Sequence, residues 1–213
     1  MKPLIAIDGP SASGKSTVAK LLAKKLNFLY VDTGAMYRAF TWKALQEKVN
    51  LTSRPEVKNL IQRVKFEILL QDGATALFID GGATTPHIRT EEVNANVSKI
   101  SAIPELREYL TNRMRQLRQE DRLVMEGRDI GTVVAPDTIY KFYIDADESI
   151  RDSRRKAQGE KDSLHQRDLF DKNRTAAPLL RAADALLIDS GKLSAEAIVD
   201  QIYERVNAMG ILK

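Results

Sequence analysis

The sequence predicts an α/β fold in which a parallel sheet carries helices on both faces. Short apolar runs of strand length alternate along the 213-residue chain with longer segments whose apolar residues recur at helical spacing. Polar motifs directly follow some of these runs, at the position where the carboxyl ends of parallel strands bind ligands. We expect a single domain with a five-stranded parallel sheet, a small antiparallel β insert and a short lid.

The first apolar run, residues 4–7, leads into the segment GPSASGKS at residues 9–16, a complete GxxxxGKS phosphate loop. Glycines allow the tight turn, and the backbone N–H groups and the positive end of the next helix face a bound anion. Lys15 would reach the β- and γ-phosphates, and the Ser16 hydroxyl would be a ligand of Mg²⁺. The loop therefore predicts a nucleoside triphosphate site.

The segments after the loop predict the next elements of the sheet. Residues 16–26 have helical spacing, and residues 28–31 form a short apolar strand. The sequence Asp32-Thr33-Gly34 is typical of a turn into a helix, and we expect Thr33 to be its N-cap. A second polar cluster then lies at the carboxyl end of a strand.

A change of periodicity marks an insert. Residues 54–64 have a helical pattern, whereas residues 65–70 and 75–79 are strand-like and are joined by Gln71-Asp72-Gly73, a hairpin signal. We expect the insert over about 65–90 and the core over about 1–64 and 91–213.

The remaining apolar runs complete the predicted sheet. Two helices follow the insert, and the second begins at Pro104, because proline is favoured at the first helical position. Beyond Ser194, Ile198, Ile202 and Val206 share one stripe of a helix that packs on the core. The further buried strands are residues 123–125, 139–144 and 185–188.

The segment 147–174 is highly charged and poor in large apolar residues. Five arginines in one segment are costly unless they meet anions, so we interpret the segment as a mobile lid, with a plain solvated surface as the alternative. These arginines are Arg151, Arg154, Arg155, Arg167 and Arg174.

The composition of the chain bears on its cellular compartment and on the charge of its partners. The chain has no cysteine, which suits a reducing compartment, and we expect a cytoplasmic protein because no signal peptide or membrane span is evident. Its net charge of +4 fits either a nucleic-acid partner or a pocket for two phosphorylated molecules. We favour the pocket, because the arginines stand beside motifs instead of forming one run.

The sequence lacks the motifs of two other classes of site, the guanine-nucleotide site and the Ser-His-Asp catalytic site. No Asn-Lys-x-Asp guanine motif occurs, and no Ser-His-Asp arrangement is evident. The two histidines, His87 and His165, are interpreted as ordinary surface or turn residues.

Four segments together are specific to one family. They are IDGPSASGKST at residues 7–17, DTGAMYR at 32–38, GRDIGTVV at 127–134, and a set from Arg167 and Asp168 through Asp171 and Asn173 to Arg174. In order and spacing the chain resembles the bacterial cytidylate kinases, nucleoside monophosphate kinases of the P-loop class. The resemblance implies transfer of the γ-phosphoryl group of ATP to CMP or dCMP with Mg²⁺, by a monomer without a membrane or nucleic-acid partner.

The resemblance also implies the site residues. ATP is expected at Gly9, Pro10, Ser11, Ala12, Ser13, Gly14, Lys15, Ser16 and Thr17. CMP is expected at Thr33, Tyr37, Arg38, Ser98, Arg107, Arg128, Asp129, Arg167, Asp171 and Arg174. The catalytic residues are expected to be Lys15, Arg128, Arg154, Arg155 and Arg174, and the Mg²⁺ ligands Ser16 directly and Glu126 through water.

Two departures from the family pattern bear on these expectations. The segment between Arg155 and Arg167 is shorter than usual, and Glu126 stands where the family has aspartate. Two alternatives stay open: an ATP-dependent kinase of another nucleoside monophosphate or a small hydroxy acid, and a nucleotide-responsive RNA-binding protein.

Overall fold

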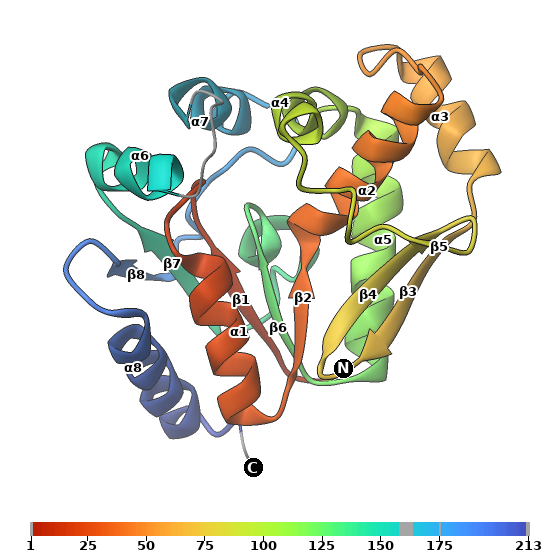
Figure 1. The fold of residues 1–213 in the computed structure, drawn as a ribbon. Coiled ribbons are helices and arrows are strands. Elements are labelled where there is room, and N and C mark those ends of the chain that lie inside the picture. Colours follow the sequence, from red (N-terminus) through yellow and green to blue (C-terminus); the bar gives the residue numbers. More distant parts are fainter. Residues whose placement is uncertain (1, 158–163, 175, 212–213) are drawn as a thin grey trace.

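Five parallel strands form the centre of the computed structural model, which describes residues 2–157, 164–174 and 176–211 (Figure 1). Their order is β2-β6-β1-β7-β8, so the strand that precedes the phosphate loop lies in the middle. The five strands predicted from the sequence are confirmed. They are β1 (Leu4–Asp8), β2 (Leu29–Asp32), β6 (Leu123–Gly127), β7 (Lys141–Asp145) and β8 (Leu186–Asp189).

Each face of the sheet is covered by helices, as Figure 1 shows. Side chains alternate along a strand, and β1 sends Leu4 and Ala6 into one apolar core and Ile5 and Ile7 into the other. One core is closed by α1 (Lys15–Leu26) and α8 (Ala195–Ala208). The other is closed by α2 (Thr33–Gln46), α3 (Arg54–Arg63), α4 (Glu91–Ile100) and α5 (Pro104–Glu120).

The insert is a hairpin of β3 (Phe66–Gln71) and β4 (Ala74–Ile79), with the short β5 (Gly82–Ala83) beside β4. Its turn residues Asp72 and Gly73 have φ of 49° and 74°, as a type I′ turn requires. The hairpin continues the main sheet, because β4 lies parallel to β2 and Tyr30 N donates to Gly73 O at 2.8 Å. Pairing between segments so far apart in the chain leaves no local signal.

The start of α2 corrects the predicted N-cap. Asp32 caps the helix, and its Oδ1 accepts a hydrogen bond from Ala35 N at 2.9 Å. Asp32 has the extended backbone of an N-cap residue, whereas Thr33 is already helical. The Thr33 hydroxyl instead donates to Glu126 O at 2.7 Å, which ties α2 to β6.

The charged segment forms α6 (Glu148–Ala157) and α7 (Leu164–Lys172), which contact each other. The shortened part of the expected lid, 158–163, lies outside the described residues. Between β6 and β7 the chain forms a single π-helical turn, η1 (Ile130–Val134), which the sequence did not predict. No helix in the described ranges combines the length and the apolar character needed to cross a membrane.

Candidate active site

A cavity of about 600 Å³ opens at the carboxyl ends of the parallel strands, where open α/β sheets bind ligands. Nine cationic residues line it, against four acidic ones, so it suits polyanions. The cations are Lys15, Lys20, Arg38, Arg89, Arg107, Arg128, Arg154, Arg155 and Arg174. The acids are Asp32, Glu126, Asp129 and Asp171.

The phosphate loop joins β1 to α1 and needs its glycines. A Cβ on Gly9 would lie 2.1 Å from Ile144 O, so no larger residue fits there. Gly14 has a φ of 85° and forms the N-cap of α1 in a left-handed conformation. The first turn of α1 faces the cavity with Lys15, so its backbone N–H groups are available to a phosphate.

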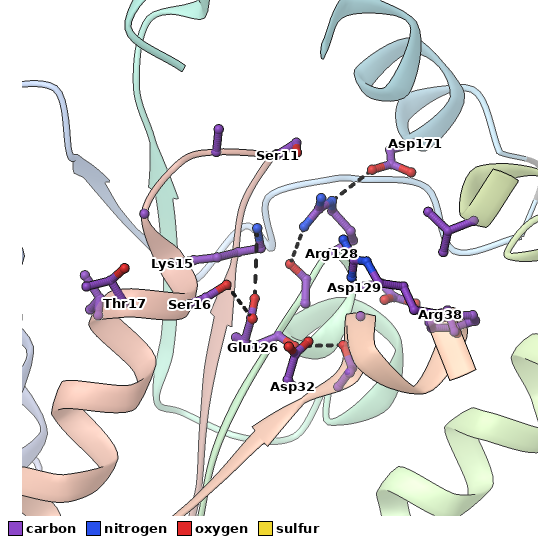
Figure 2. A pocket seen from close by; sticks show the side chains of 18 of the residues that line it. Ser11, Lys15, Ser16, Thr17, Asp32, Arg38, Glu126, Arg128, Asp129 and Asp171 are labelled. Carbon is purple, nitrogen blue, oxygen red and sulfur yellow. Dashed lines mark hydrogen bonds and ion pairs between the residues drawn. The ribbon is translucent and has the colours of Figure 1, made fainter. Parts of the chain in front are cut away.

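Glu126, at the end of β6, is the partner of the loop's functional side chains (Figure 2). Ser16 Oγ donates to Glu126 Oε1 at 2.6 Å, and the Tyr30 hydroxyl donates to the same oxygen at 3.2 Å. Lys15 Nζ lies 3.9 Å from Glu126 Oε2, and burial lowers the pKa of Lys15 to about 7. A bound triphosphate would supply the negative charge that favours the ammonium form.

The same cluster fits Mg²⁺ in its donor chemistry. The ion prefers hard oxygen ligands, and the neighbouring oxygens of Ser16 and Glu126 are a hydroxyl and a carboxylate. The longer side chain of glutamate at position 126 reaches the serine hydroxyl directly.

Across the cavity, one carboxylate holds two of the expected phosphate-binding arginines. Arg128 Nε donates to Asp171 Oδ2 at 2.9 Å, and Arg174 pairs with the other oxygen of Asp171 (Figure 2 shows the first contact). The third arginine, Arg38, donates from Nε to Asn94 Oδ1 at 3.3 Å, and burial lowers its pKa.

The expected base-reading residues also meet. Arg107 Nη2 donates to Asp129 Oδ2 at 2.5 Å, and both side chains are buried. The Arg107 guanidinium lies over the Tyr37 ring, 5.2 Å from its centroid, and Ser98 on α4 lines the same space. A carboxylate, a guanidinium and an aromatic face therefore share one subsite.

The arginines of the expected lid contact the phosphate loop and its surroundings. Arg155 Nη1 donates to Ser11 Oγ at 3.1 Å. Arg154 donates to Ser190 Oγ at 3.0 Å and to Ser190 O at 2.7 Å, and Ser190 Oγ donates to Ser13 O at 2.7 Å. The side chain of Arg167, expected at the ribose, lies outside the described residues.

The sequence did not single out three groups that belong to this site. Arg89 pairs with Asp32 at 2.8 Å and lines the cavity, but it lies in an irregular segment that carries no motif. Ser190 follows β8 and has no distinctive neighbours in the sequence. Asp32 could have been found, because it stands in the DTGAMYR segment at the end of a strand.

Comparison with known proteins agrees with this geometry. The sequence model of the family described as cytidylate kinase matches residues 5–208. The chain belongs to the cytidylate kinase family. Cytidylate kinases of Geobacillus sp. (strain WCH70) and Bacillus subtilis (strain 168) are 42% and 39% identical to it, over 95% of this chain and 96% and 95% of theirs. The cytidylate kinase of Desulforamulus reducens is 44% identical over 93% of this chain and 94% of its own.

Among solved structures, an uncharacterized protein from Eubacterium ventriosum ATCC 27560 superposes with a TM-score of 0.50 over 98% of this chain and 99% of its own. Its sequence identity is 13%, so the likeness concerns the fold alone.

Proposed function

We propose that the two sides of the cavity hold the two nucleotides of a cytidylate kinase, ATP on the phosphate loop and CMP or dCMP against α2, α4 and η1. The enzyme transfers the γ-phosphoryl group of ATP to the acceptor and yields ADP with CDP or dCDP. The observation that carries the proposal is the Arg128–Asp171–Arg174 cluster, which shares one cavity with the phosphate loop.

On the donor side, residues 9–17 surround the phosphates, the backbone N–H groups of the loop other than at Pro10 donate to them, and Lys15 neutralises the β- and γ-oxygens. Ser16 would hold Mg²⁺ directly and Glu126 through water, and the bound ion would neutralise charge on the phosphates. Arg154 and Arg155 stand beside the loop and stabilise the charge that develops on the transferred group.

On the acceptor side, Arg38, Arg128 and Arg174 bind the CMP phosphate through planar guanidinium groups. Asp129, Arg107, Ser98 and Arg128 read the cytosine edge, because Asp129 accepts from its exocyclic amine and the cations donate to its ring nitrogen and carbonyl. Asp171 and Arg167 hold the ribose, and Thr33 and Tyr37 line the pocket.

The acceptor needs no general base. Its phosphate has a second pKa near 6 and is largely dianionic at neutral pH, so positioning and charge neutralisation drive the transfer. This explains why the described part of the cavity works without a histidine.

The expected oligomeric state and compartment follow from the proposed substrates. Because the proposed substrates are free nucleotides, we expect a monomer that acts on cytoplasmic nucleotides and does not need a nucleic-acid partner.

A coupled assay of ADP formation tests the function with ATP, Mg²⁺ and a panel of acceptors. We expect kcat/KM for CMP and dCMP to exceed that for UMP, AMP and GMP by about tenfold or more, because a wrong base leaves buried polar groups unpaired. A preference for a hydroxy acid or for another monophosphate would favour the alternative kinase. Salt-sensitive RNA binding without acceptor-dependent ADP formation would favour the regulatory protein.

A further inference from the structure

The π turn η1 directly follows Asp129, the residue proposed to read the base. Two hydrogen bonds hold this turn. Val134 N donates to Asp129 O at 3.2 Å and Ala135 N donates to Ile130 O at 2.8 Å, and each bond spans five residues. π turns are rare and occur often at functional sites. Like any short helix, this one leaves N–H groups at its start and carbonyls at its end without partners in the turn.

A buried carboxyl group accepts hydrogen bonds from the N–H groups at the start of the turn. Asp8 Oδ1 accepts from Ile130 N at 2.9 Å, and Asp8 Oδ2 accepts from Gly131 N at 2.8 Å. Asp8 is 5% exposed, and it stands on β1 immediately before Gly9 of the phosphate loop. The approach leaves little spare room, because a Cβ on Gly131 would lie 3.4 Å from Asp8 Oδ2 and 3.2 Å from a Lys141 carbon.

A guanidinium donates hydrogen bonds to the carbonyl groups at the end of the turn. Arg115, on α5, donates from Nε to Val134 O at 3.2 Å and from Nη2 to Val133 O at 2.8 Å. A cation at the end of the turn also matches the dipole of a helical turn. Neither Asp8 nor Arg115 lines the cavity, so their bonds to η1 are structural supports for their neighbours in the site.

We propose that Asp8 and Arg115 are positioning residues for base recognition, because they clamp η1 at both ends and so fix the direction of the Asp129 carboxylate. Through Asp8 the clamp joins the base-reading turn to the strand that carries the phosphate loop. The inference rests on the proposed role of Asp129.

Asp8→Asn is the sharpest test, because it keeps the shape but presents an amide N–H₂ group to a backbone N–H donor. Arg115→Met keeps the aliphatic stem and removes the guanidinium, and it serves if Asp8→Asn does not fold. The matched control is Arg113→Met on the same helix, since among the residues that the structure describes the Arg113 guanidinium bonds only to Gln116 on its own helix.

In both clamp variants we expect the KM for CMP to rise about tenfold and the preference for CMP over UMP to fall by a similar factor. The KM for ATP should stay within about twofold, and the control should match the wild-type protein. Hydrogen exchange of residues 130–135 should become faster in the clamp variants only.

Faster exchange with unchanged selectivity would overturn the positioning role, and so would an equal rise of the KM values for ATP and CMP. Unchanged exchange would show that the clamp does not hold the turn. If the wild-type protein shows no preference for CMP, the proposed function itself fails, and the exchange result still reports on the clamp.

Discussion

At the scale of single residues, the site consists of charges that hold one another in place before any ligand arrives. Asp171 keeps Arg128 and Arg174 together, and Asp129 pairs with Arg107. Two guanidinium groups close together repel each other, so the shared carboxylate lowers the cost of keeping both at the proposed site of the acceptor phosphate. A carboxylate can therefore assist the binding of an anion.

Arg128→Ala should abolish acceptor binding selectively. We expect kcat/KM for CMP to fall by about a thousandfold or more, since the guanidinium is proposed to contact phosphate oxygens whose charge grows in the transition state. ATP affinity, measured by calorimetry without acceptor, should change little. The control is Arg181→Ala, at an exposed position. An equal loss of ATP affinity would contradict the assigned role.

Asp8 should make stability depend on pH. Burial raises the pKa of Asp8 from 3.8 to about 7, and the charge of Asp129 acts in the same direction, whereas the two backbone N–H groups and Arg128 oppose it. Between these values the folded protein keeps a proton that the unfolded chain releases. The stability that Asp8 contributes is therefore lost as the pH rises towards 7, by up to about 1.4 kcal/mol per unit.

Thermal unfolding of the wild-type protein and Asp8→Asn from about pH 5 to pH 8 measures this effect. The stability of the wild-type protein relative to Asp8→Asn should fall as the pH rises to about 7 and should then stay level. A difference that stays constant over the whole range would show that Asp8 does not titrate there.

At the scale of elements, the site depends on close contacts between the end of β6, α2 and η1. Thr33 bonds to the backbone of Glu126, and Gly127 packs against both Thr33 and Ile130. These contacts set the distance between η1 and the helix that carries Arg38.

Gly127→Ala should separate these elements. A Cβ there would lie 2.6 Å from Thr33 Oγ1 and 2.8 Å from Ile130 Cδ1, so the side chains of Thr33 and Ile130, or the elements that carry them, must move. We expect a loss of about 1–3 kcal/mol in the free energy of unfolding, measured in urea, and a higher KM for CMP. Gly82→Ala is the control, because its Cβ would meet only Ile79 O at 3.4 Å. Equal stability of the two variants would refute the argument.

At the scale of the whole molecule, the sheet separates two apolar cores and leaves its carboxyl edge to a cationic cavity. Cytosine and uracil nucleotides carry the same phosphate charge, so this excess of cations cannot distinguish them. The affinity for nucleotide phosphates and the selectivity between the two bases should therefore respond differently to salt.

Raising the ionic strength should raise the KM values for CMP and UMP by a similar factor, since salt screens the phosphate contacts. The preference between the two bases should hardly change, because it depends on buried hydrogen bonds. Steady-state kinetics over a salt series measures both. A preference that collapses with salt would indicate that long-range charge, and not the Asp129 subsite, selects the base.

Much of the molecule followed from the sequence by itself. The five parallel strands, the helix after the phosphate loop and the hairpin turn at Asp72-Gly73 were predicted, because periodicity and glycine placement act over a few residues. The family motifs also named most residues that line the cavity, since three of the four motifs begin at the ends of β1, β2 and β6, where the cavity opens.

Only the tertiary structure decided the rest. The pairing of β4 with β2, the π turn and the bonds from Asp8 and Arg115 to η1 join or depend on partners that the sequence pattern does not reveal. A local pattern records which residues avoid water and which turns a backbone can make. Which carboxylate meets which N–H group depends on how the strands stack side by side, and that is determined when the whole sheet packs.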